Sequence, residues 1–171
     1  MNAYEALASG YCYPDSGHLA NLEVGADAIP AGAARRSYRR FTGLIAEMDL
    51  SEWEELHTRT LDLSPLFAPY VGYVTWGESY QRGAFLASMN RAQAEAGVDP
   101  NGELPDHLDP VLRYLARVPE PLPELVEVLA PSVDKMLKAL KKAEPENPYV
   151  HLLSATKRMV SHDAQSSGGD E

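Results

Sequence analysis

The sequence predicts an all-α fold, a single-domain bundle built from many short helices. Apolar residues recur at intervals of three and four along most of the 171-residue chain, which is the spacing of one helix face. Runs with the alternation or β-branched composition of strands are few. Thirteen prolines divide the chain into short pieces, which disfavours a bundle of four long rods.

The first clear helix is predicted at residues 38–48. Its apolar face is formed by five residues: Tyr38, Phe41, Leu44, Ile45 and Met48. Ser51 and Glu54 then have the spacing of a capping box, with Trp53 and Leu56 opening the next apolar stripe. Residues 24–32, which are rich in Gly, Ala and Pro, are expected to form a surface loop ahead of these helices.

The pattern is ambiguous at residues 70–76. This stretch has a β-prone composition, but no second run pairs with it, and its neighbours have helical spacing. We therefore expect a helix there, ended by Gly77, and a second helix from Tyr80 to Ala96. Ser79 fits the N-cap position of that second helix.

Three further helices are predicted in the C-terminal part. The first has four apolar residues on one face: Leu108, Val111, Leu112 and Leu115. The second is the longest, over residues 122–140, and Pro131 inside its apolar stripe predicts a kink or a restart. Pro148 is suited to open the last helix, which would turn four residues inward: Tyr149, Leu152, Leu153 and Val160.

Length and composition limit the class of protein. We expect one domain over residues 1–160 and a disordered C-terminal tail over residues 161–171, which are small and polar. The formal charge of -10 argues against a nucleic-acid partner, and the single cysteine, Cys12, excludes an internal disulfide or a Cys-based zinc site. No segment reaches the about 18–20 continuous apolar residues of a membrane span. The N-terminus lacks the features of a secretory signal, so we expect a cytoplasmic protein without stable membrane insertion.

No motif of catalytic or metal-binding chemistry is complete. Gly77 to Gln81 begins like a nucleophile elbow, but the closing glycine is missing. Asp99 to Glu103 begins like a calcium loop without completing the ligand pattern, so we interpret it as a turn. Phosphate-binding glycine loops and paired metal-ligating histidines are absent from the sequence. We therefore expect no enzyme activity, no metal and no cofactor.

Two charged motifs each allow two interpretations. The run from Arg35 to Arg40 holds four of the fifteen basic residues and is interpreted as the solvated face of a helix, with a docking patch for an acidic partner as the alternative. Asp106 and His107 follow a proline at a predicted helix start, where a carboxylate fits a cap. Such a pair can also bind a peptide, and replacing both residues by alanine would then weaken peptide binding by more than ~1 kcal/mol without unfolding the protein.

Several segments, taken together, are similar to those of one family. They are Tyr13-Pro14-Asp15, then Leu63-Ser64-Pro65 with Tyr73, Trp76-Gly77-Glu78-Ser79 and Arg82-Gly83, then Glu103-Leu104-Pro105-Asp106-His107-Leu108, and finally Asn147-Pro148-Tyr149. In this order, over residues 4–160, the set resembles the NarJ-type nitrate reductase assembly chaperones of the TorD/DmsD group of redox-enzyme maturation proteins. Trp76 stands where the family usually has tyrosine, and Asp109 separates the D-H-L element from its proline.

The resemblance implies a chaperone that binds the N-terminal segment of a molybdenum-containing catalytic subunit. Such a chaperone holds the apo-enzyme until the molybdopterin guanine dinucleotide cofactor is inserted, and it delays docking onto the membrane-anchored subunit. The peptide-binding residues carried over from the matching motifs are Tyr70, Tyr73, Trp76, Glu78, Arg82, Asp106 and His107. Helical spacing predicts that Tyr73, Trp76 and Tyr80 share one face as an aromatic wall, unless these rings belong to the core.

Three other functions stay open on the sequence alone. The same fold could serve another molybdenum enzyme, such as a chlorate, selenate, dimethyl sulfide or ethylbenzene oxidoreductase. A small helical enzyme or nucleotide hydrolase would need a site that the motifs do not supply. An adaptor acting through Arg35 to Arg40 would bind its partner with strong salt dependence.

Overall fold

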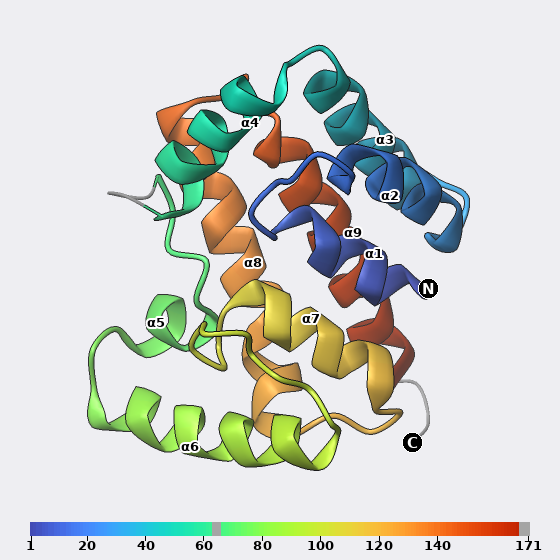
Figure 1. Ribbon diagram of the computed structural model, residues 1–171. Coiled ribbons are helices and arrows are strands. Elements are labelled where there is room, and N and C mark those ends of the chain that lie inside the picture. The colour runs from blue at the N-terminus through green and yellow to red at the C-terminus, as the bar shows by residue number, and fades with distance from the viewer. Residues whose placement is uncertain (63–65, 168–171) are drawn as a thin grey trace.

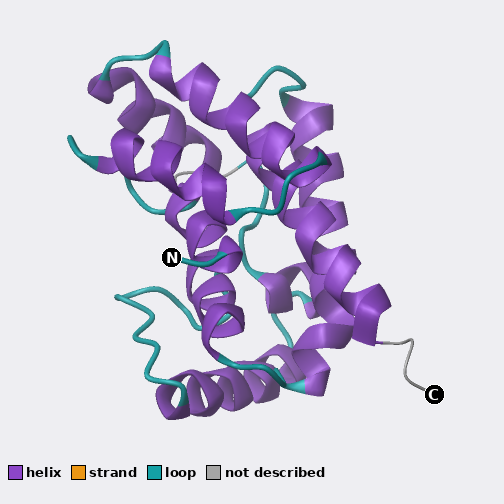
Figure 2. Cartoon of the chain, turned by 90° about the vertical axis from the view of Figure 1, so that its right-hand side faces the viewer, coloured by secondary structure: helices purple, strands orange, loops and turns teal. Residues whose placement is uncertain are grey.

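The computed structural model describes residues 1–62 and 66–167, and it is helical throughout (Figure 1). Its α-helices are α1 (Ala3–Gly10), α2 (His18–Gly25), α3 (Ala33–Ala46), α4 (Leu50–His57), α5 (Val71–Trp76), α6 (Tyr80–Glu95), α7 (Leu108–Arg117), α8 (Pro123–Ala143) and α9 (Tyr149–Ser167). A 3-10 turn (Ala26–Ala28) and a π-helical segment (Thr58–Asp62) follow α2 and α4. Figure 2 shows no strand in the described part of the chain, so the all-α prediction is confirmed.

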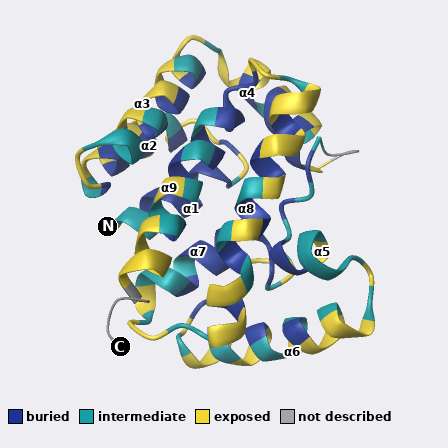
Figure 3. Cartoon of the chain, turned by 180° about the vertical axis from the view of Figure 1, so that it is seen from behind, coloured by how far each residue is buried: buried dark blue, intermediate teal, exposed yellow. Residues whose placement is uncertain are grey.

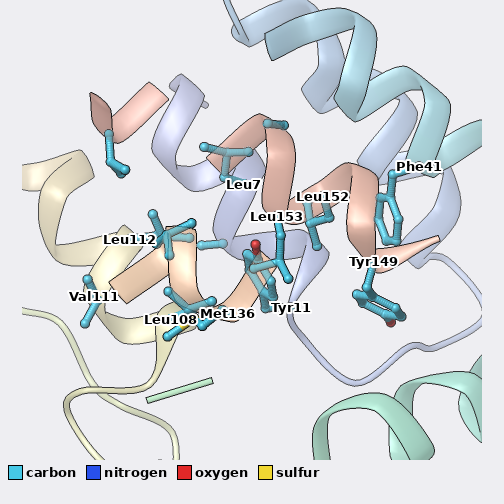
Figure 4. Packing of buried hydrophobic residues seen from close by; sticks show 14 of the residues in the cluster. Leu7, Tyr11, Phe41, Leu108, Val111, Leu112, Met136, Tyr149, Leu152 and Leu153 are labelled. Atoms are coloured by element: carbon cyan, nitrogen blue, oxygen red, sulfur yellow. The ribbon is translucent and has the colours of Figure 1, made fainter. Parts of the chain in front are cut away.

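Helix α9 organises the core. It packs against α3 and α8, and α1 lies between α9 and α7. The four residues of this helix that were predicted to face the core are all buried: Tyr149, Leu152, Leu153 and Val160. The Leu152 side chain lies against Gly10 at the end of α1. Figure 4 shows Leu153 near Tyr11, and Tyr149 beside Phe41 of α3. The last helix therefore joins the N-terminal and C-terminal parts of the chain in one core.

Helix α3 has the two faces that its sequence predicts. Tyr38, Phe41 and Ile45 are buried, whereas Arg36, Arg39 and Arg40 are exposed. Arg35 is half-buried and donates hydrogen bonds to the carbonyls of Asp27 and Ile29. Arg39 pairs with the exposed Asp27 at 2.8 Å, a surface contact of small energy. The segment ahead of α3 is not the surface loop predicted from its composition, because it includes the end of α2 and a 3-10 turn, and Ile29 is fully buried.

Two predicted helix limits are wrong, and the longest helix does not restart at Pro131. Helix α4 begins two residues earlier than the Ser51 cap implies, because the Asp49 carboxylate accepts a 2.8 Å hydrogen bond from the Glu52 amide. Helix α8 runs through Pro131 without a restart, since residues on both sides of the proline pack into the core. Helix α9 reaches Ser167, so residues 161–167 are helical, and Tyr4 donates a hydrogen bond to Asp163 within them.

Other residues of these predictions lie outside the described ranges. They are Leu63-Ser64-Pro65 of the resemblance and residues 168–171 of the predicted tail. Within the described residues, no helix is both long enough and apolar enough to cross a membrane.

Helices α5 and α6 form a hairpin at one end of the molecule. Gly77 adopts a φ of +65°, a left-handed conformation that glycine takes without strain, and this ends α5 as predicted. The Ser79 hydroxyl then accepts a hydrogen bond from the Arg82 amide and caps α6. Helix α6 packs against α5 and buries only a narrow stripe of Phe85, Met89 and Gln93; most of its remaining surface is open (Figure 3).

Candidate functional site

The loop before α7 pairs with the start of α5. The Val71 amide donates to the Asp106 carbonyl at 2.9 Å, and the Leu108 amide donates to the Pro69 carbonyl at 3.0 Å. These bonds form an isolated antiparallel bridge between Tyr70 and His107. Two segments that carry separate parts of the family resemblance therefore meet through their backbones.

Asp106 is fully buried at this junction. Its carboxylate accepts hydrogen bonds from Arg82 Nε at 3.1 Å and Arg82 Nη2 at 3.2 Å, and from the Gly72 amide at 3.1 Å. Such a two-pronged guanidinium contact is a strong, oriented interaction. A Cβ at position 72 would lie 2.8 Å from Asp106 Oδ2, so only glycine permits this approach. Asp106 is consequently not a helix cap, and its carboxylate joins α5, α6 and the loop before α7.

His107 takes the capping position instead. Its Nδ1 accepts a 3.1 Å hydrogen bond from the Asp109 amide at the start of α7. The ring is buried and meets Tyr70 edge-on, with ring centroids 5.2 Å apart. Burial lowers the pKa of His107, which favours the neutral ring that an accepting Nδ1 requires. His107 thus stabilises α7 and supports the Tyr70 ring.

Arg82 lies between two tyrosine rings. Its guanidinium carbon is 5.6 Å from the centre of the Tyr70 ring and 5.4 Å from that of Tyr73, both within cation–π range. The Tyr70 hydroxyl donates to Glu103 at 3.3 Å. Burial, followed by the Glu103 charge, raises the pKa of Tyr70 to about 12 and keeps the hydroxyl protonated. Tyr73 is 42% exposed, so this arrangement presents one aromatic ring at the surface.

Five of the seven predicted site residues therefore form one contact cluster, named here the Asp106 cluster: Tyr70, Tyr73, Arg82, Asp106 and His107. Trp76 does not belong to it, because its ring packs against Phe85 of α6 at 5.1 Å. Glu78 is exposed in the turn between α5 and α6. The single aromatic wall predicted from helical spacing is wrong, since α5 ends at Trp76 and Tyr80, 90% exposed, belongs to another helix.

Three residues that hold the cluster together are not among the residues predicted from the sequence. Gly72 admits the Asp106 carboxylate, and Glu103 holds the Tyr70 hydroxyl. Gln93 of α6 donates a 2.7 Å hydrogen bond to the Pro105 carbonyl and fixes the loop from the other side. Glu103 stands inside the E-L-P-D-H-L element, which could have singled it out, whereas nothing in the local sequence distinguishes Gly72 or Gln93.

A second buried polar group surrounds His57. Trp53 Nε1 donates to the Tyr149 hydroxyl at 3.2 Å, and that hydroxyl lies 3.2 Å from His57 Nδ1. His57 Nε2 is 3.9 Å from Asp62, and the side chain is 4% exposed. Burial lowers the pKa of His57 to about 4, although Asp62 opposes the shift. This histidine is therefore neutral at physiological pH and joins α4 to the start of α9.

The remaining chemically reactive groups are restrained. Cys12 is half-buried, with its sulfur 3.6 Å from both the Ala8 carbonyl and Asp109 Oδ1. Burial and the Asp109 charge raise the pKa of the Cys12 thiol to about 12, so it is not a nucleophile at neutral pH. In the described ranges, no three His, Cys, Asp or Glu side chains are grouped so that they could hold a metal ion.

Comparison with known proteins identifies the fold. No family model matches the sequence, and no curated protein sequence matches it. The structure is similar to a crystal structure from Archaeoglobus fulgidus of a protein described as a redox enzyme maturation protein, with a TM-score of 0.65 and 18% sequence identity. The alignment covers 92% of this chain and 91% of that chain. The chain therefore has the fold of that protein over nearly its whole length.

Proposed function

We propose that this protein is an assembly chaperone of the redox-enzyme maturation type, a binding protein and not an enzyme. Its client is the N-terminal segment of a molybdenum-containing catalytic subunit, which it holds until the cofactor is inserted and before the subunit docks at the membrane. The shared fold with the Archaeoglobus fulgidus protein supports the chaperone class. The NarJ-like order of motifs supports a respiratory nitrate reductase as the client and the cytoplasm as the compartment.

The observation that carries the proposal is the contact between the two most specific motifs. Arg82 belongs to the W-G-E-S-x-x-R-G element, and Asp106 belongs to the E-L-P-D-H-L element, 24 residues further on. Their buried ion pair fixes two loops and two helices around one exposed tyrosine. An ion pair whose two charges are both bonded within the protein, and which holds an exposed aromatic ring in place, suits recognition better than turnover.

The Asp106 cluster acts in this proposal as a scaffold for recognition. Asp106 and His107 already use their polar atoms within the protein, so they position the surface and do not grip the peptide themselves. Tyr73 and Glu78 are exposed, so these two residues of the predicted set are able to contact a client directly. An aromatic face beside a carboxylate suits a segment that carries both apolar and basic side chains.

Calorimetric titration tests the proposal directly. The probe is a synthetic peptide of about 20 residues, long enough for an amphipathic helix, from the N-terminus of the nitrate reductase catalytic subunit of the same organism. We expect saturable one-to-one binding with a Kd of about 1 μM. Tyr73→Ala should weaken it several-fold, whereas Val24→Ala, at an exposed position on α2, should not.

Absence of binding to this peptide would contradict the nitrate reductase assignment. The same titration with N-terminal peptides from chlorate, selenate, dimethyl sulfide and ethylbenzene oxidoreductases then tests the alternative clients. If none of these peptides binds to the folded protein, the chaperone proposal itself fails.

A further inference from the structure

A groove separate from the Asp106 cluster opens between α5, α6 and α8. Its volume is about 440 Å³, and it is lined by Thr75, Trp76, Gln81, Ala84, Phe85, Glu124, Glu127 and Val128. We call it the α5–α8 groove. No residue of the Asp106 cluster lines it, and among the predicted site residues it contains only Trp76.

The floor of the α5–α8 groove is apolar. The Trp76 and Phe85 rings are tilted against each other with centroids 5.1 Å apart, and Val128 of α8 adds an aliphatic side chain to the lining. Phe85 is 2% exposed, whereas Trp76 and Val128 are only half-buried. A volume of this size accommodates a few side chains and not a whole helix. Two or three apolar side chains of a partner would complete the burial of Trp76.

The rim of the groove is negatively charged. Glu124 and Glu127 stand three residues apart on α8, which places them on one helix face, and both are exposed. No Lys, Arg or His lines the groove. Neither carboxylate forms a salt bridge within the part of the chain that the structure describes. An apolar floor beside two carboxylates without basic partners is complementary to a segment that is both apolar and basic.

We propose that the α5–α8 groove binds a cationic amphipathic segment, whose apolar side chains contact Trp76 and Val128 and whose Lys or Arg side chains pair with Glu124 and Glu127. This inference rests on the proposed function, since it gives the client segment a location and a chemical class. Helix α5 would then join two parts of one recognition surface, with Tyr73 in the Asp106 cluster and Trp76 in the groove. A second copy of this chain is a poorer occupant, because each copy has a net charge of -10.

Trp76 provides the direct readout. The probe is an amidated 14-residue peptide of leucine and lysine, arranged so that leucines occupy one helix face. Its matched control carries glutamate at every lysine position. We expect the lysine peptide to shift the tryptophan emission to shorter wavelength, because it would bury the half-exposed Trp76 further, while Trp53 is already buried. The shift should be absent from Trp76→Phe.

Variants of the rim and of the opening locate the site. Glu124→Gln/Glu127→Gln should weaken binding of the lysine peptide by roughly fivefold at low salt and reduce its salt dependence. Ala84→Lys, at an exposed position of α6, should abolish binding because it places a long cation in the groove. Its control, Ala94→Lys, puts the same side chain on α6 outside the groove and should bind normally.

Three results would overturn the inference: equal binding of the glutamate peptide, unchanged affinity of the Glu124→Gln/Glu127→Gln variant, or normal binding by Ala84→Lys. The client peptide separates this failure from a failure of the proposed function. If the nitrate reductase peptide binds to wild type and to Ala84→Lys alike, the chaperone proposal stands and the groove is not its site. If the lysine peptide binds in the groove but no client peptide binds anywhere, the groove inference stands and the client assignment fails.

Discussion

The substitution Asp106→Ala is the sharpest test of the buried junction between α5, α6 and the loop before α7. It removes two hydrogen bonds from Arg82 and one from the Gly72 amide. It also leaves the Arg82 guanidinium, which is 13% exposed, without its carboxylate. The variant therefore combines lost bonds with an uncompensated, largely buried charge.

The expected loss follows from those contacts. Removing one partner of a buried ion pair costs about 3–5 kcal/mol. Arg82 retains some contact with water and stacks between two tyrosine rings, so we expect the lower end, about 3 kcal/mol. Total stabilities of about 5–15 kcal/mol leave the variant folded. With a urea m-value of about 2 kcal/mol/M, the unfolding midpoint should fall by roughly 1.5 M.

Urea unfolding followed by circular dichroism measures the effect, and a double-mutant cycle assigns it. Arg82→Ala leaves Asp106 buried and unpaired, so it should cost at least as much as Asp106→Ala. The double variant should be clearly more stable than the sum of the two losses predicts, by about 2 kcal/mol. A loss below about 1 kcal/mol for Asp106→Ala, or additive single effects, would refute the reasoning.

The buried position of Asp106 also changes how peptide binding by Asp106 variants is interpreted. The sequence analysis expects replacement of Asp106 and His107 to leave the fold intact. Since both side chains are buried and bonded within the protein, we now expect the double replacement to destabilise it. Weaker peptide binding by that variant would report a displaced surface and not a lost contact with the peptide.

Three further predictions concern stability. Burial lowers the pKa of His57 from 6.5 to about 4, so between these pH values the unfolded chain binds a proton that the folded chain does not. The free energy of unfolding should therefore fall by about 3 kcal/mol as the pH drops through this window, and His57→Gln should flatten that dependence in urea unfolding at a series of pH values. Gly72→Ala should lower the free energy of unfolding by about 1–3 kcal/mol, because the new Cβ would lie 2.8 Å from a buried carboxylate, whereas Gly83→Ala has open space and should stabilise α6 by about 0.5–1 kcal/mol. Similar effects of the two substitutions in urea unfolding would contradict the close approach at Gly72. Asp49→Ala should lower the free energy of unfolding by about 1 kcal/mol because it removes the cap of α4, and Ser51→Ala should change it very little. A larger loss for Ser51→Ala than for Asp49→Ala in thermal unfolding would show that Ser51 is the cap.

The helical elements were predictable because their signal is local. A face such as Leu108, Val111, Leu112 and Leu115 repeats every three or four residues, and any helix there must bury it. Gly77 and Ser79 were equally readable, since a left-handed residue and a hydroxyl cap act on their immediate neighbours. The error at Asp49 arose because adjacent residues compete for the cap position. Helix α8 continues through Pro131 because packing on both sides of the proline overrides its local preference.

The sequence singled out residues that lie together in the structure, but it did not indicate their geometry. The motifs named five residues that meet, yet spacing could not show that the Asp106 carboxylate is turned inward. Spacing also placed Tyr73, Trp76 and Tyr80 on one face, although the turn after Trp76 separates them. A short break in a helix rotates everything beyond it, so face assignments carried across such a break fail.

The sequence by itself determined the helices, the single domain-sized core and the excess of acidic charge, because these depend on composition and on contacts between near neighbours. Only the tertiary structure decided which side chain faces which. The Arg82–Asp106 pair needs Gly72 to lack a side chain and Gln93 to hold the loop, and the α5–α8 groove needs α8 to bring two glutamates beside Trp76. Such contacts depend on how helices pack, since residues far apart in the chain share no local pattern that would reveal them.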